Sequence, residues 1–148
     1  MATSQPTAAI AVRLERTYAA PPEKVFDAFT QAKALSRWFG SSDNTTVVVH
    51  TLEPRVGGRY RVEMKMTDGT NNIVAGVYET VTRPSRLVFS WEWETMPQHG
   101  NSRVTVSIEP AGTGSKLVLV HEQLPTAEAR ERHTAGWNGC LDRLAKNL

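Results

Sequence analysis

The feature that most constrains this chain is an unbroken series of strand-like segments across its middle, between residues 45 and 123. The segments are TTVVVHTLE, GRYRVEMKMTDG, NIVAGVYETVTRP, RLVFSWEWET, SRVTVSIEP and SKLVLVHEQ. Each is rich in β-branched or aromatic residues and is bounded by Gly, Pro, Asp or Asn. Because the turns between them are short, as at Asp68-Gly69, the pattern predicts hairpins and an antiparallel meander.

Helical segments lie on both sides of this series. Residues 12–18 alternate as a first strand, and two short helices follow it, one beginning near Pro22 and one over residues 31–39. Thr126 is placed to cap a final helix that runs almost to the end of the chain. The sequence therefore predicts an α+β fold in the order strand, two helices, six strands, helix.

A sheet of about seven strands curls, because strand twist accumulates across it. Its concave face must be filled, and the last helix is the longest amphipathic element available. The apolar stripe of that helix has helical spacing and consists of His133, Trp137, Cys140, Leu141, Leu144 and Leu148. We expect the curled antiparallel sheet to grip this helix.

Length and composition indicate one domain. We assign residues 10–148 to it and residues 1–9 to a flexible N-terminus, since 148 residues can bury a sizeable core. A single cysteine, no secretory signal and no long apolar run predict a soluble, cytoplasmic protein. The net charge of +2 comes from interspersed charges, so we expect no nucleic-acid partner and no membrane insertion.

Cysteine and histidine chemistry is constrained by geometry. Cys140 and His133 are seven residues apart on one helix, roughly 10 Å along its axis, which is too far for a thiolate–imidazole pair. We expect Cys140 to pack in the core. His121 and Glu122 are strand neighbours that point to opposite faces, so they cannot share an ion, and we expect no metal and no cofactor.

The remaining histidines and the last strand give weaker signals. His50 and His99 have no ligand-like spacing, and we expect both to be solvated or hydrogen-bonded at the surface. On residues 116–123 both alternations are partly apolar, so the pattern alone leaves open whether His121 or Glu122 faces inward.

Four segments, in order, resemble bacterial proteins related to the activator of heat-shock-protein-90 ATPase, within the START-like or SRPBCC superfamily. They are RLERTYAAPPEKVFDAFTQAKALSRWFG, GGRYRVEMKMTDG, GVYETVTRPSRLVFSW and HTAGWNGCLDRL, and the match covers about residues 12–148. The resemblance implies the helix-grip fold, a hydrophobic cavity between sheet and last helix, and an inward-facing His121. Relatives include polyketide cyclases, lipid-transfer domains and the co-chaperone itself, so the fold does not fix the activity.

We favour a non-enzymatic protein that binds a small hydrophobic or amphipathic molecule in this cavity. Aromatic side chains and methionines are typical of such walls. The candidate lining residues are Tyr60, Met64, Met66, Phe89, Trp91, His121, His133, Trp137 and Cys140.

Two alternatives use the same fold differently. One is a polyketide-cyclase-like enzyme in which His121 and His133 transfer protons. The other is a protein-binding accessory or co-chaperone-like factor that uses its outer surface. A homodimer through a sheet edge or a helix is compatible with either, although no residue signals it.

Overall fold

The computed structural model describes residues 10–40 and 44–148, and one seven-stranded antiparallel sheet dominates it. The strand order is β1-β7-β6-β5-β4-β3-β2, so β2 to β7 pair in sequence and β1 joins β7. The strands are β1 (Val12–Tyr18), β2 (Thr45–Leu52), β3 (Arg59–Met66), β4 (Asn71–Thr82), β5 (Arg86–Trp93), β6 (Asn101–Ala111) and β7 (Gly114–Glu122). The predicted antiparallel meander is confirmed. The predicted flexible N-terminus, residues 1–9, lies outside the described residues.

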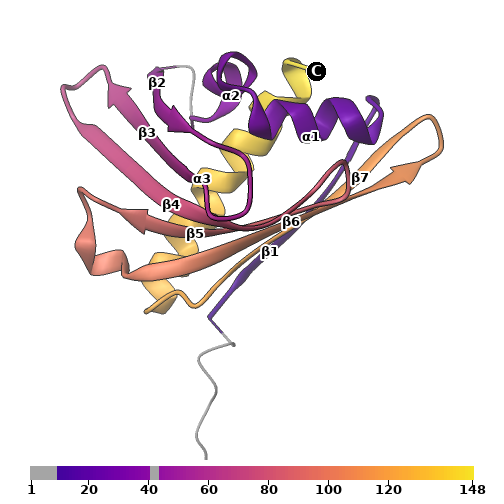
Figure 1. Ribbon diagram of the computed structural model, residues 1–148. Coiled ribbons are helices and arrows are strands. Elements are labelled where there is room, and N and C mark those ends of the chain that lie inside the picture. Colours follow the sequence, from indigo (N-terminus) through magenta and orange to yellow (C-terminus); the bar gives the residue numbers. More distant parts are fainter. Residues whose placement is uncertain (1–9, 41–43) are drawn as a thin grey trace, which may run out of the picture.

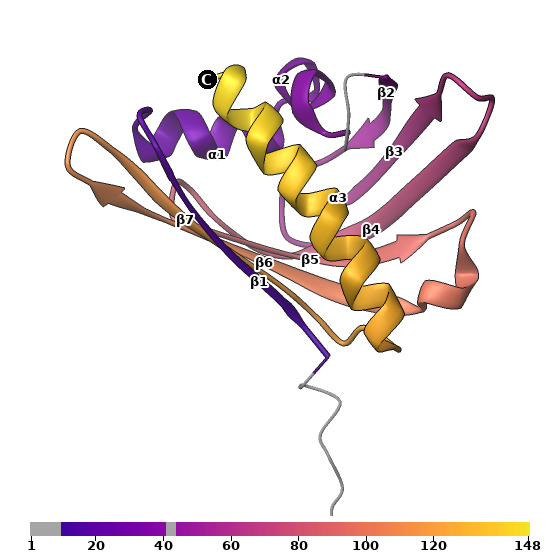
Figure 2. The same ribbon diagram turned by 180° about the vertical axis from the view of Figure 1, so that it is seen from behind.

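The helices lie on the concave side of the sheet. They are α1 (Pro22–Thr30), α2 (Ala32–Trp38) and α3 (Ala127–Lys146), with a short 3-10 helix, η2 (Pro97–His99), between β5 and β6. Figure 1 shows the sheet curling around α3, with α1 and α2 above the same face. Seen from behind, α3 runs diagonally across the strands (Figure 2). This is the predicted helix-grip arrangement.

Two irregularities in strand pairing add to the curl of the sheet. The pairing shifts register between Val49 and Thr51 on β2, and between Tyr78 and Thr80 on β4. Such bulges increase local strand twist. At Gly76 on β4, an added Cβ would lie 2.0 Å from the carbonyl oxygen of Ser90 on β5. The close approach of these strands therefore requires glycine.

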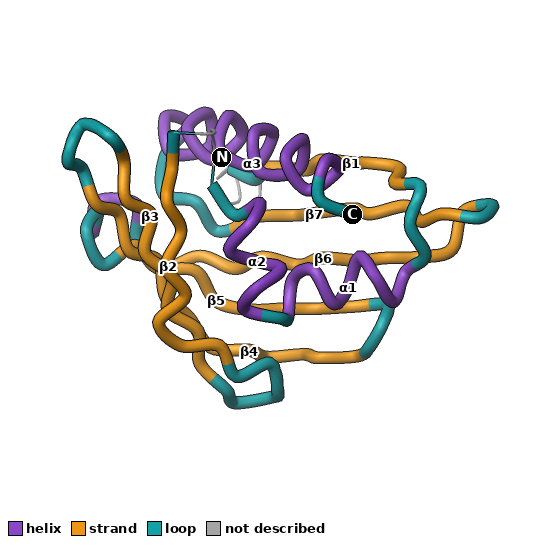
Figure 3. The backbone as a smooth tube through the Cα atoms, turned by 90° about the horizontal axis from the view of Figure 1, so that it is seen from above, coloured by secondary structure: helices purple, strands orange, loops and turns teal. Residues whose placement is uncertain are grey.

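The last helix is fixed along the β1 edge of the sheet. Thr126 caps it, as predicted. The hydroxyl of Tyr18 donates to the backbone carbonyl of Leu141 over 3.0 Å, and the Arg16 guanidinium donates to the Asn138 side chain over 2.6 Å. Figure 3 shows α3 beside β1 accordingly. One flank of the helix is thus held, and the other faces β3, β4 and β5.

The end of the core beneath α1 and α2 is solidly packed. Trp38 is 1% exposed, and its indole N–H donates to the carbonyl of Ala28 over 2.9 Å. Its ring meets Phe29 edge-on, with the ring centroids 4.7 Å apart. Trp38 is therefore a packing anchor between the two helices.

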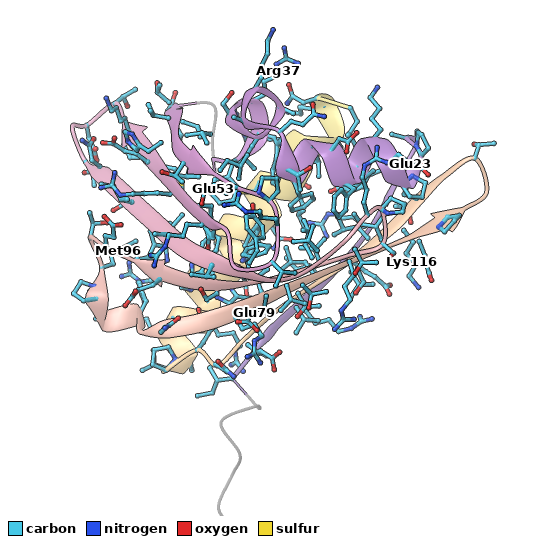
Figure 4. All side chains as sticks on the ribbon, in the orientation of Figure 1. Glu23, Arg37, Glu53, Glu79, Met96 and Lys116 are labelled. Carbon is cyan, nitrogen blue, oxygen red and sulfur yellow. The ribbon has the colours of Figure 1, made fainter. Side chains whose placement is uncertain are left out.

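Charged side chains cover the convex face of the sheet. Glu79 and Lys116 project from it (Figure 4), and they pair with Arg103 at 3.1 Å and with Glu15 at 3.3 Å. Among the described residues, Val56 is the one large hydrophobic side chain that is mainly exposed. The described helices include none with the length and apolar character needed to cross a membrane.

Candidate ligand-binding site

A cavity of about 450 Å³ lies between α3 and the sheet, toward the end of the molecule that is remote from α1. The sheet and the segment after α2 contribute Phe39, Thr45, Met64, Met66, Asn72, Trp91 and Trp93. The β5–β6 connection contributes Met96 and His99, and α3 contributes Arg132, His133, Ala135, Gly136, Trp137 and Cys140. Figure 4 shows Met96, one of these lining residues, at the margin of the fold.

The alternation on β3 explains why the space opens at this end. Tyr60, Val62, Met64 and Met66 share the inner face of the sheet. Tyr60 and Val62 are 5% and 1% exposed, whereas Met64 and Met66 are half-buried. The same face therefore passes from packed core into cavity wall along a single strand.

Three of the residues predicted to line the cavity, Tyr60, Phe89 and His121, are not part of its wall. Tyr60 and Phe89 border a separate void of about 30 Å³, which is the volume of roughly one water molecule. Their rings pack edge-on, with the centroids 5.5 Å apart. They belong to the aromatic core beneath α1 and α2 rather than to the main cavity.

His121 faces inward on β7 and is fully buried behind the cavity wall. Trp137 Nε1 donates to His121 Nδ1 over 3.0 Å, so the proton of the neutral ring is on Nε2. That nitrogen lies 2.7 Å from Ser102 Oγ, whose hydroxyl donates to the backbone carbonyl of Trp91. Both ring nitrogens of His121 are thus occupied by protein groups.

His133 forms a second pair of the same kind and does line the cavity. Trp93 Nε1 donates to His133 Nε2 over 3.0 Å, and His133 Nδ1 donates to the backbone carbonyl of Ala129 over 2.7 Å. The centroids of the His121 and His133 rings are 4.7 Å apart. The structure therefore brings the two histidines together, each held by an indole N–H.

Burial keeps both rings neutral. It lowers the pKa of His121 well below the ordinary value of 6.5, and the nearby His133 lowers it further. Burial also lowers the pKa of His133, against the opposing effect of the Ala129 carbonyl that accepts its N–H. Proton transfer to a ligand would require one of the four hydrogen bonds to break. These hydrogen bonds hold the side chains of the cavity wall in place. Neither His121 nor His133 has a free nitrogen lone pair that could act as a general base.

The surface location expected for His99 is wrong. Its side chain is 6% exposed, because η2 turns the chain inward and places the imidazole 5.2 Å from the His133 ring, centroid to centroid. No other described residue hydrogen-bonds to its ring nitrogens. The expectation for His50 is confirmed, since that residue is exposed and lies 2.8 Å from Glu63 Oε1.

Cys140 is part of the cavity wall and is 7% exposed. Burial raises the pKa of its thiol to about 12, so it is a neutral thiol at physiological pH. Within residues 10–40 and 44–148, no three His, Cys, Asp or Glu side chains are arranged to hold a metal ion.

Several wall residues were missed by the sequence prediction, and their signals differ. Trp93 continues the alternation of Phe89 and Trp91 on β5, so its position could have been found. Arg132 and Gly136 precede the correctly predicted Cys140 at steps of four along one flank of α3, which is also a readable signal. His99 and Met96 lie in a connection, where no periodicity applies.

A curled antiparallel sheet that grips a C-terminal helix defines the START-like helix-grip class of proteins. Within that class, the chain belongs to the family described as Activator of Hsp90 ATPase homolog 1-like protein, whose model matches residues 19–148. No curated protein matches the chain.

Solved structures of similar chains agree with this assignment. A protein from Chromobacterium violaceum is 28% identical, with a TM-score of 0.87 over 93% of this chain and 96% of that chain. The AHSA1 protein from Silicibacter pomeroyi is 29% identical, with a TM-score of 0.80 over 92% of this chain and 95% of that one. A protein from Arthrobacter aurescens, 19% identical over 96% of this chain and 87% of that one, shares the fold with a TM-score of 0.83.

Proposed function

We propose that this protein binds a small hydrophobic or amphipathic molecule in the cavity between α3 and strands β3 to β5. The observation that carries the proposal is the cavity itself. Its volume of about 450 Å³ falls within the range of small-molecule sites, and Met64, Trp91 and Trp137 are among its mainly apolar walls. An apolar void of that size lowers the stability of a fold, which favours a role for the space.

The polar features of the molecule favour this function over the two alternatives. The polyketide-cyclase-like alternative uses His121 and His133 for proton transfer, and both nitrogens of each ring are engaged with protein groups. A protein-binding accessory factor needs an exposed apolar patch. Among the described residues, Val56 is the one large hydrophobic side chain that is mainly exposed, and a single side chain does not form a patch. A ligand carrier requires neither feature.

Filling the cavity from α3 tests the proposal. Gly136 is part of the wall, and a Cβ built on it meets no atom within 4 Å. A leucine there would occupy open space, and it is a better helix former than glycine by up to about 1 kcal/mol. We expect Gly136→Leu to fold normally and to lose at least tenfold in affinity for N-phenyl-1-naphthylamine, a neutral probe that fluoresces in apolar sites.

Ala145→Leu is the matched control, because it adds the same side chain at an exposed position of the same helix. It should leave the probe affinity unchanged. If the wild-type protein gives no fluorescence increase, or if Gly136→Leu binds the probe as the wild type does, the proposed site is wrong.

A further inference from the structure

The cavity wall is not uniformly apolar. Its charged or hydrogen-bonding groups include His99 on η2 and Arg132 on α3, and both adjoin His133. The His99 ring packs against His133, and Arg132 precedes His133 in the chain. Apolar side chains such as Met64 and Trp137 form most of the remaining wall, together with Thr45 on β2 and Asn72 on β4. The part of the wall formed by His99 and Arg132 is its polar end, and the rest of the wall is mainly apolar.

His99 is the strongest indication of what the polar end binds. The side chain is more than nine-tenths buried, at 6% exposure, and its ring nitrogens have no hydrogen-bonding partner in the described part of the chain. An imidazole carries at least one N–H donor in either protonation state. The ring nitrogens are not among the fully buried unpaired side-chain atoms of the described residues, so they border the open space of the cavity, where an acceptor on a ligand can meet this donor.

Arg132 supplies a positive charge at the rim of the same end. Its closest acidic partner is Glu128, with Nε and Oε1 3.8 Å apart, and the two side chains are 65% and 77% exposed. Ion pairs of that kind are weak. The guanidinium is therefore available to an anionic group that enters beside His99, and carboxylates are matched to its paired N–H donors.

The volume bounds the size of the apolar part. At about 30 Å³ for each water-sized group, a cavity of about 450 Å³ holds roughly fifteen non-hydrogen atoms. We propose that the ligand is an amphipathic carboxylate of about that size, with its acid group at His99 and Arg132 and its apolar part along Met64 and Trp137. This inference rests on the proposed function and adds the chemical class of the ligand.

Displacement of N-phenyl-1-naphthylamine by dodecanoate and by 1-dodecanol tests this class, because the two chains have equal length and differ in the head group. We expect wild-type protein to bind dodecanoate at least tenfold more tightly than dodecanol, and His99→Phe to lose that preference while it keeps its affinity for dodecanol. Arg132→Gln should weaken dodecanoate binding severalfold. Lys146→Gln, which removes the same charge at an exposed position of α3, should have no effect.

The outcomes separate this inference from the proposed function. Equal affinities for dodecanoate and dodecanol in the wild type, or equal losses for both in Arg132→Gln, would overturn the carboxylate assignment while cavity binding stands. If neither chain displaces the probe and the probe itself does not bind, the proposed function fails as well. Should His99→Phe not fold, the wild-type comparison and Arg132→Gln still decide.

Discussion

Two histidine–tryptophan pairs, His121 with Trp137 and His133 with Trp93, lie at the cavity. The hydrogen bonds of each pair are consistent with a neutral imidazole ring. In both pairs an indole N–H points at the nitrogen that would accept a proton, at 3.0 Å from His121 Nδ1 and from His133 Nε2. Protonation would set two donors against each other. The pairs therefore orient Trp137 and Trp93, which both line the cavity, only while the histidines are uncharged.

A pH dependence of stability follows from these pairs. In the unfolded chain the histidines become charged as the pH falls below about 6.5, while burial keeps the folded-state pKa of His121 and His133 lower. The unfolded state then binds more protons, so the free energy of unfolding decreases with falling pH. For a fully buried neutral histidine such as His121, the limiting slope is about 1.4 kcal/mol per pH unit. Urea unfolding at pH 7, 6 and 5 measures this loss.

Two variants assign the slope to the buried rings. His133→Gln removes one titrating group and should flatten the decrease between pH 7 and pH 5. Ala145→Gln introduces the same side chain at an exposed position of α3 without changing a titrating group, and it should leave the slope as it is. The opposite pattern would contradict the role given to the buried pair. Carboxyl groups whose pKa is lowered in the fold, such as Glu15, change the free energy of unfolding at lower pH than the histidines do. They therefore do not account for the slope between pH 7 and pH 5.

The last helix depends on its first turn, because its N-terminal half forms one wall of the cavity. Thr126 Oγ1 accepts the backbone N–H of Ala129 over 3.0 Å, and the carbonyl of Ala129 in turn accepts from His133 Nδ1. The cap is therefore connected to the cavity wall through Ala129, which hydrogen-bonds to both Thr126 and His133.

Removal of this cap should be measurable. We expect Thr126→Ala to lower the free energy of unfolding by about 1 kcal/mol, as is usual for a lost N-cap side chain, and Thr126→Ser to retain most of it. Thermal or urea unfolding monitored by circular dichroism at 222 nm provides the comparison. Equal stability of Thr126→Ala and wild type would show that the first turn is held by other contacts.

At the scale of the whole molecule, the fold was predictable and the shape of the cavity was not. Strand alternation, hairpin turns and the apolar stripe of α3 depend on local chemistry, so the order and pairing of elements follow from them. The division of the inner face into core and cavity depends on where α3 lies across the sheet. Phe89 and Trp91 share one face of β5, yet Phe89 packs in the core and Trp91 lines the cavity.

The burial of residues in the connections between strands could not be predicted from sequence periodicity. His99 becomes buried because η2 folds over the end of the cavity, and no spacing in the sequence encodes that turn. The inward orientation of His121 was ambiguous in the strand pattern and was supplied by the family resemblance. The structure places Leu117, Leu119 and His121 on the inner face, each fully buried.

The central claim is that the space between α3 and the sheet is where a ligand binds, and its methionines allow a direct measurement. The chain has four methionines, and Met64, Met66 and Met96 line the cavity. Protein labelled with carbon-13 at the methionine methyl groups is titrated with N-phenyl-1-naphthylamine, with signals assigned through Met→Leu variants. We predict that the three cavity signals shift together and saturate with the fluorescence increase. Binding of the probe without movement of these signals would contradict the account.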